Sequence, residues 1–221
     1  MQFGRLGSIL ALSFMLVVLP ALSWYYLSKG VTYRRDRLSQ LKHYGEVPAF
    51  NFRTIRGTTV SQDSLHGNIT LISVLDVSSP TSAAIADAEL LRFQKAFGPE
   101  RDDIRILSIP LGKATDSVAV STFAKAHKTG RVWTLVQGDS SSTFRRFVSR
   151  LGIEQYTGVT DVVGTPYFLL IDTSGQIRHY YPAVHDSINR MIELTALMMR
   201  PTPKSEIRYK RNNGTPTPAT K

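Results

Sequence analysis

The chain has 221 residues, no cysteine and a formal net charge of +10. The absence of cysteine excludes disulfides, thiolate zinc sites, iron–sulfur clusters and thiol redox chemistry. Residues 1–44 and 200–221 each carry six basic side chains and one acidic side chain, whereas residues 45–199 carry 15 of each sign. Because this middle part has no excess positive charge to offer phosphates, the sequence indicates no nucleic-acid partner.

An uncharged apolar stretch covers residues 6–28, after an N-terminal cap of residues 1–5. About 20 such residues suffice to cross a bilayer, and the aromatic residues at 24–26 suit its interface. We therefore predict a transmembrane anchor over 6–28 and a basic juxtamembrane linker over 29–45. Two alternatives are a cleaved signal peptide ending at Ala21-Leu22-Ser23 and a buried core helix.

Apolar periodicity predicts alternating strands and helices in one domain over residues 46–199. A hairpin is predicted over 48–62, where two β-rich runs flank Arg56-Gly57. Apolar runs bounded by turn residues predict strands at 69–75, 104–109, 132–136, 167–171 and 176–181. Four helices are predicted where apolar side chains recur at helical spacing. Their predicted buried faces are Ala86, Leu90, Phe93 and Phe97; Val120, Phe123, Ala124 and His127; Phe144, Phe147, Val148 and Leu151; and Ile188, Met191, Ile192 and Thr195.

The order of these elements is strand–helix repeats, then a hairpin and a helix. This order predicts an α/β fold with parallel strands first and an antiparallel pair last. Residues 200–221 are polar, basic and rich in Pro and Thr, which predicts a disordered tail. The basic part of this tail, 204–210, is also a candidate contact with anionic lipid.

Several short motifs lie between the apolar stretch and the last predicted helix. They are Val47-Pro48-Ala49-Phe50, Gly57-Thr58-Thr59-Val60-Ser61 with Leu65-His66-Gly67, Gly164-Thr165-Pro166, and Leu170-Ile171-Asp172-Thr173-Ser174-Gly175-Gln176. Together with the N-terminal span, this order resembles the Sco/SenC family, over about residues 1–199. The resemblance implies a thioredoxin-like fold, with a central mixed sheet flanked by helices and one N-terminal transmembrane helix.

In the Sco/SenC family a Cys-Pro-x-x-x-Cys run heads the helix that follows the first central strand. A His before the penultimate strand completes a copper site there. In this chain the matching positions are Ser79, Pro80 and Ala83, and no His stands near Thr165. The resemblance therefore implies degenerate active-site positions at Ser79, Pro80, Ala83, Thr165 and Pro166, with no catalytic residue, no metal ligand and no cofactor. Thr165-Pro166 matches the cis-proline of the fold, which either retains a peptide-docking groove or simply shapes the turn.

Other candidate sites carry weaker patterns. His179 and His185 lie six residues apart without an acidic residue at ligand spacing, so we read them as surface or half-buried side chains. Ser79 as a nucleophile would need a base, and only Asp76 is close in sequence.

The resemblance implies a membrane-anchored, non-catalytic binding or assembly factor linked to respiratory (cytochrome oxidase) complexes. Its partners would be proteins of a membrane complex, with no small-molecule substrate. The alternatives are a structural accessory subunit of such a complex and an enzyme with Ser or His chemistry. We predict the inner membrane, with the domain on the periplasmic side that the resemblance implies. The basic residues of 29–42 favour the cytoplasmic side by the positive-inside rule.

Overall fold

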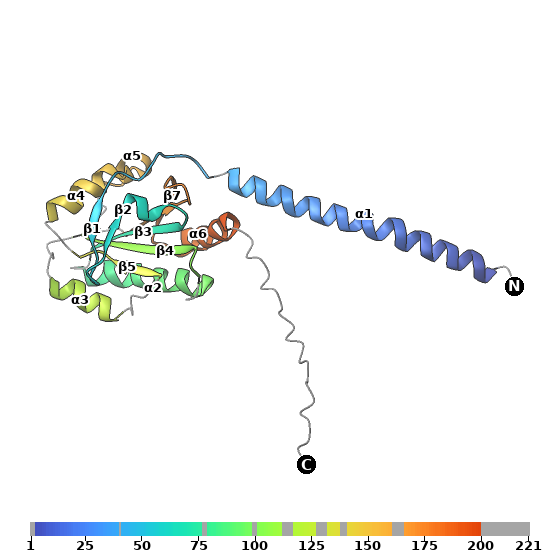
Figure 1. The fold of residues 1–221 in the computed structure, drawn as a ribbon, viewed down its shortest axis with the longest axis horizontal. Coiled ribbons are helices and arrows are strands. Elements are labelled where there is room, and N and C mark those ends of the chain that lie inside the picture. The colour runs from blue at the N-terminus through green and yellow to red at the C-terminus, as the bar shows by residue number, and fades with distance from the viewer. Residues whose placement is uncertain are drawn as a thin grey trace, which may run out of the picture.

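A long helix, α1 (Phe3–Ser39), projects from a domain in which helices cover both faces of a β-sheet (Figure 1). This computed structural model describes residues 3–39, 41–76, 79–98, 101–111, 117–126, 132–137, 141–160 and 166–199. The predicted tail, 200–221, lies outside the described residues.

The central sheet has five strands in the order β5-β4-β3-β6-β7. Their bounds are β3 (Ile69–Asp76), β4 (Ile104–Leu111), β5 (Trp133–Leu135), β6 (Tyr167–Ile171) and β7 (Ile177–Pro182). β3 pairs in parallel with β4 and β4 with β5, whereas β6 pairs antiparallel with both β3 and β7. The predicted α/β class, with parallel strands followed by an antiparallel hairpin, is confirmed.

The two faces of the sheet bury different hydrophobic clusters. β3 is buried along its whole length, and its side chains alternate between the faces: Leu71 and Leu75 join one cluster, and Ile72 and Val74 the other. The first face is covered by α2 (Pro80–Phe97), α3 (Ser117–Ala126) and α6 (His185–Met198). The second is covered by α4 (Ser141–Arg150), α5 (Ile153–Thr157) and β1 (Asn51–Arg53).

The predicted local elements agree with the structure in most places. β1 and β2 (Thr59–Ser61) form the predicted hairpin, and a 3-10 helix, η1 (Gln62–Leu65), follows it. The described residues of the four predicted apolar faces are buried or half-buried, whereas His127 lies outside the described residues.

Two elements differ from the sequence-based prediction. β4 continues through Pro110 to Leu111, and β5 pairs with β4 only as far as Ser108. A proline without an N–H is tolerated there because β5 does not pair with β4 at that position. The predicted loop before Gly164 contains the short helix α5, which begins and ends at glycines with positive φ, Gly152 and Gly158. A helix of five residues is too short to show a hydrophobic period.

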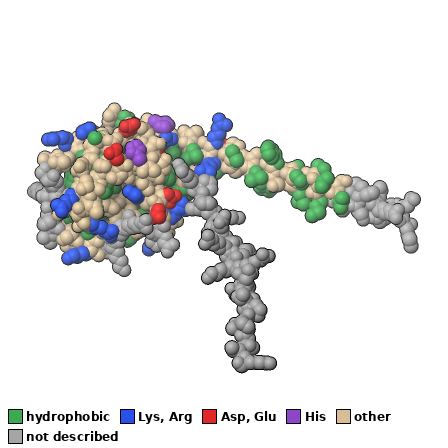
Figure 2. Space-filling view, viewed as in Figure 1, with side chains coloured by type: hydrophobic (Ala, Val, Ile, Leu, Met, Phe, Trp, Pro, Cys, Tyr) green, Lys and Arg blue, Asp and Glu red, His purple; other side chains and the backbone are tan. Residues whose placement is uncertain are grey.

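The predicted span lies within α1, and the helix continues through the basic stretch to Ser39. By length and composition Leu12–Ser39 can cross a membrane, and its most apolar 18 residues have a mean hydropathy of 1.3. None of these 18 residues is buried in the domain, and Trp24 is 77% exposed; Figure 2 shows the hydrophobic side chains in the open along the projecting helix. The alternative of a buried core helix is therefore wrong.

Candidate functional site

The head of α2 holds three of the predicted site positions. Ser79 is the N-cap: its hydroxyl accepts a hydrogen bond from the Ser82 N–H at 3.3 Å, and its carbonyl accepts one from the Ala83 N–H at 2.9 Å. Pro80 occupies the first helical position, where a missing N–H costs nothing. Serine followed by proline is thus a favourable way to begin a helix. The Ser79 hydroxyl is engaged as a cap.

Pro166 lies at the same edge of the sheet as the head of α2. Strands β3 and β6 are antiparallel with Val74 opposite Tyr167, so Pro166 falls beside the end of β3, from which the chain leads to Ser79. Pro166 is buried, and its carbonyl accepts a hydrogen bond from the Ala183 N–H at 3.0 Å. Thr165, and with it the peptide bond to Pro166, lies outside the described residues.

The chemistry available at this edge is limited. Asp76, at the end of β3, is 8% exposed, and Ser82 is 3% exposed with a hydroxyl that accepts no hydrogen bond and donates none among the described residues. Among all the residues that the structure describes, no group of three or more His, Asp and Glu side chains could hold a metal ion. A Ser hydroxyl is also a poor ligand for Cu(I), which prefers thiolates. The head of α2 therefore offers a helix N-terminus and hydroxyls, without a thiol or a metal-ligand set.

Exposed apolar side chains surround this edge. Ile85 on α2 is 42% exposed, and Val184, which precedes α6, is 53% exposed. The two lie near one another, because Glu89, one turn after Ile85, is 4.0 Å from the ring of His185, which follows Val184. The exposed residues Pro80, Thr81, Ala84 and Ala88 add an uncharged surface on α2. We call these six residues the α2 surface: Pro80, Thr81, Ala84, Ile85, Ala88 and Val184.

The two histidines considered as metal ligands have structural roles. The His185 Nδ1 lies 2.7 Å from the Arg92 Nη1, which links α6 to α2. The ring of His179 stacks on Tyr181 at 4.4 Å between centroids, and its Nδ1 donates to the Tyr180 carbonyl at 2.8 Å. Burial lowers the pKa of His179 below its usual value. His179 is therefore neutral at pH 7 and packs as an aromatic side chain.

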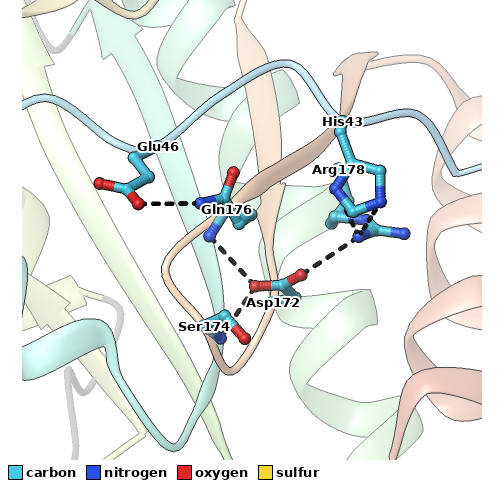
Figure 3. A network of polar contacts seen from close by, with 6 residues as sticks. All are labelled: His43, Glu46, Asp172, Ser174, Gln176 and Arg178. Carbon is cyan, nitrogen blue, oxygen red and sulfur yellow. Dashed lines mark hydrogen bonds and ion pairs between the residues drawn. The ribbon is translucent and has the colours of Figure 1, made fainter.

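A polar network fixes the hairpin between β6 and β7 (Figure 3). The Asp172 carboxylate accepts hydrogen bonds from the N–H groups of Ser174 and Gln176, at 2.9 and 3.1 Å, and pairs with Arg178 at 3.4 Å. The same Arg178 Nη1 lies 3.0 Å from the His43 Nδ1. The turn was predictable, since Asp commonly begins turns that end in Gly. Its contact with residue 43 was not.

This hairpin also holds the segment that follows α1. The Tyr44 N–H donates to the Ile177 carbonyl at 3.0 Å, and the Ile177 N–H donates to the Gly45 carbonyl at 2.8 Å. The Gln176 side chain donates to Glu46 at 3.1 Å. Residues assigned to the linker from the sequence thus pair with the edge of β7.

Two open pockets lie away from these positions, beside α4. The larger, of about 360 Å³, is at the end of β4, and the smaller, of about 260 Å³, lies between α4 and β1. The first is lined by Leu111, Arg145, Val148, Ser149, Ile153, Glu154 and Thr160, and the second by Ala49, Phe50, Asn51, Phe52, Thr143, Arg146, Phe147 and Arg150. Sequence reasoning missed both pockets. The sequence feature that could have indicated them is the set of three arginines on the polar side of α4: Arg145, Arg146 and Arg150.

Comparison with known proteins gives structural relatives only. No protein-family model and no curated protein matches the chain. The chain is similar to BsSco, a member of the Sco family of cytochrome c oxidase assembly proteins, with 22% identity, a TM-score of 0.55, and coverage of 71% of this chain and 94% of that one.

The chain is likewise similar to copper-bound ScoI of Bradyrhizobium japonicum, with 16% identity, a TM-score of 0.51, and coverage of 69% and 99%. A third relative is the thioredoxin domain of a thiol-disulfide oxidoreductase from Bacteroides vulgatus, with 18% identity, a TM-score of 0.51, and coverage of 69% and 96%. Similarity at these identities establishes the architecture. The domain that follows α1 has a thioredoxin-like fold.

Proposed function

We propose that the chain is a degenerate Sco-related protein, anchored in the inner membrane by residues 6–28 with its domain on the periplasmic side. It acts as a non-catalytic binding or assembly factor linked to respiratory cytochrome oxidase complexes. The resemblance of its motifs to the Sco/SenC family supports this proposal. So does its structural similarity to BsSco, a member of a family of cytochrome c oxidase assembly proteins.

The observation that supports a non-catalytic role is which residues occupy the head of α2 and what they bind. The positions that hold cysteines in the Sco/SenC family are Ser79 and Ala83 here, and the chain has no cysteine elsewhere. The Ser79 hydroxyl caps α2, and Ala83 donates its N–H to the same residue. These contacts stabilise the helix and supply neither a soft ligand nor a redox couple.

The α2 surface supports a role in protein binding. Its exposed residues carry no charge, and Ile85 and Val184 are large apolar side chains in contact with solvent. A protein partner that covers them would gain the hydrophobic free energy of that buried area, about 25 cal/mol per Å². We assign the partner contact to this surface because it adjoins the degenerate site positions.

Photo-crosslinking in native membranes tests this assignment. A photoreactive amino acid replaces Ile85 in one variant and, as a matched control, the exposed Lys125 of α3 in another. We expect cytochrome oxidase subunits to be captured from position 85 and absent from position 125, as measured by mass spectrometry. Capture from both positions, or from neither, would contradict the proposal. A fixed stoichiometry with the purified complex would favour the accessory-subunit alternative, since an assembly factor is present only substoichiometrically.

Two further measurements test the remaining parts of the proposal. Titration of the full chain with Cu(I) is expected to show no binding tighter than about micromolar, because the chain lacks thiolates. Stoichiometric tight binding would contradict a degenerate site. Reporter fusions after Met199 determine the side of the membrane on which the domain lies, and activity of a periplasmic reporter is the expected result.

A further inference from the structure

The last turns of α1 are attached to α6 by one face of the helix. Tyr33 and Arg37, one turn apart, both contact Glu193: the Tyr33 hydroxyl donates to its carboxylate, and the Arg37 Nε lies 3.4 Å from the same oxygen. Leu38 packs against the hydrophobic cluster beneath α6, and Leu41 is 6% exposed within it. The end of α1 from Tyr33 to Ser39, together with Leu41, is therefore packed on the domain.

Arg34 completes this attachment at the end of α6. Its Nε and Nη2 donate to the Leu197 carbonyl at 3.1 and 2.8 Å, and its Nη2 also donates to the Met199 carbonyl at 3.3 Å. The last carbonyls of a helix have no intrahelical partners and carry the negative end of the helix dipole, so a guanidinium there is favourable. These contacts attach the last turns of α1 to the end of α6.

The contacts also set the direction of α6. Arg37 contacts residue 193, whereas Arg34, nearer the apolar part of α1, contacts residues 197 and 199. Residues later in α6 thus contact residues earlier in α1, which are closer to the predicted span. The C-terminal end of α6 points toward the bilayer.

The height of this end above the bilayer follows from helix geometry. Ser28 is the last residue of the predicted span, and Arg34 is six residues further along the same unbroken helix. At 1.5 Å per residue the two lie about 9 Å apart along the axis. The headgroup region of one leaflet is about 5–8 Å thick. The end of α6 therefore lies at the outer edge of the headgroups.

Basic side chains gather at this height. Lys29 and Arg35 are exposed, one and seven residues beyond the predicted span, and Asp36 is the one acidic residue between 29 and 42. The sequence that follows Met199 adds five basic residues and one acidic residue by position 211. We infer that the C-terminal end of α6, with Lys29 and Arg35, forms a contact surface for the headgroups of anionic lipids. This inference rests on the proposed membrane anchor.

Site-directed labelling of the full chain in lipid nanodiscs tests the position of this surface. Because the chain has no cysteine, Ala196→Cys on α6 and Lys125→Cys on α3 each give a single nitroxide site at an exposed position. Nickel-chelating lipids should shorten the relaxation of the label at position 196 and leave the label at 125 at its nickel-free value. Figure 1 shows α3 on the far side of the domain from α1.

Selectivity for lipid charge is measured with spin-labelled phosphatidylglycerol and phosphatidylcholine. The double variant Lys29→Gln and Arg35→Gln should lower the preference for phosphatidylglycerol, by up to about fivefold per charge removed. The matched control, Arg145→Gln and Arg150→Gln on exposed positions of α4, should leave the preference unchanged.

The outcomes separate this inference from the anchor on which it rests. If the unaltered chain fails to float with vesicles, the anchor is wrong and this inference falls with it. If the chain floats but the labels at 196 and 125 relax alike, or if both double variants change selectivity alike, the inference alone is overturned.

Discussion

Replacing Ser79 with cysteine should give a thiol whose pKa lies about one unit below the ordinary value near 8.5. The side chain at this position caps α2, accepting the Ser82 N–H at 3.3 Å, and a thiolate there would also lie at the positive end of the helix dipole. A charge at a helix terminus is stabilised by about 0.3–2 kcal/mol, and 1.36 kcal/mol corresponds to one pKa unit. Residue 79 is half-exposed, so desolvation offsets only part of this effect.

The assay is the rate of alkylation by iodoacetamide as a function of pH. The chain has no other thiol, so Ser79→Cys reports on this position alone. Ala88→Cys, at an exposed position in the middle of the same helix, is the matched control and should titrate near the ordinary value. A thiol at position 79 that titrates at or above the control would refute the claim that the head of α2 still stabilises an anion.

Three further predictions concern stability. Ser108→Ala removes the hydroxyl that accepts the buried Trp133 indole N–H at 2.8 Å and should lower the free energy of unfolding by about 1–3 kcal/mol in urea titrations; no change would contradict it. Burial raises the pKa of Tyr180 well above its usual value, so the stability from its protonated form is complete below pH 10 and is lost as the pH rises further; Tyr180→Phe should flatten this alkaline loss in thermal melts. Burial lowers the pKa of His179, so the stability that its neutral form contributes is present above about pH 6.5 and is lost on acidification. A His179→Gln variant whose stability falls with acid as steeply as that of the unaltered chain would disprove this.

The architecture could be predicted from the sequence because its signals are local and repeated. The strand at 69–76 is mostly apolar and bounded by turn residues, and α2 buries Ala86, Leu90 and Phe93 at helical spacing. Such patterns survive in any fold that covers both faces of a sheet. The helix α5 escaped prediction because one turn and a half is shorter than the period that reveals a helix.

The attachment of α1 to α6 could not be predicted by the same means. Residues 33, 34, 37 and 38 do share one face of α1, but two of them are arginines. Next to an apolar span, arginines are typical of lipid-facing or solvent-facing positions. In the structure Arg34 binds the last carbonyls of α6, a partner 163 residues away in the sequence. Tertiary pairing of this kind leaves no local pattern.

The candidate site positions could be named from the sequence, but the structural role of Ser79 could not. The positions of Ser79 and Pro166 followed from the order of motifs, and the register of β3 and β6 brings them to one edge of the sheet. The sequence alone did not show what Ser79 does there. As the N-cap of α2 it contributes about 1 kcal/mol to the helix, which is comparable to what other good caps provide. Serine at this position thus satisfies the helix N-terminus by itself.

The two proposals together constrain where a partner must bind. The α2 surface includes Val184, at the N-terminal end of α6, and the orientation inferred above places the C-terminal end of α6 at the headgroups. The 14 residues of α6 span about 21 Å. Arg34, Arg37 and Glu193 attach α6 to the end of α1, so the distance of the α2 surface from the span depends on helix packing and helix length. With the long axis of α6 directed away from the bilayer, the α2 surface lies up to about 20 Å above the headgroups, and the two proposals together favour a partner with an extramembrane domain over a subunit confined to the bilayer.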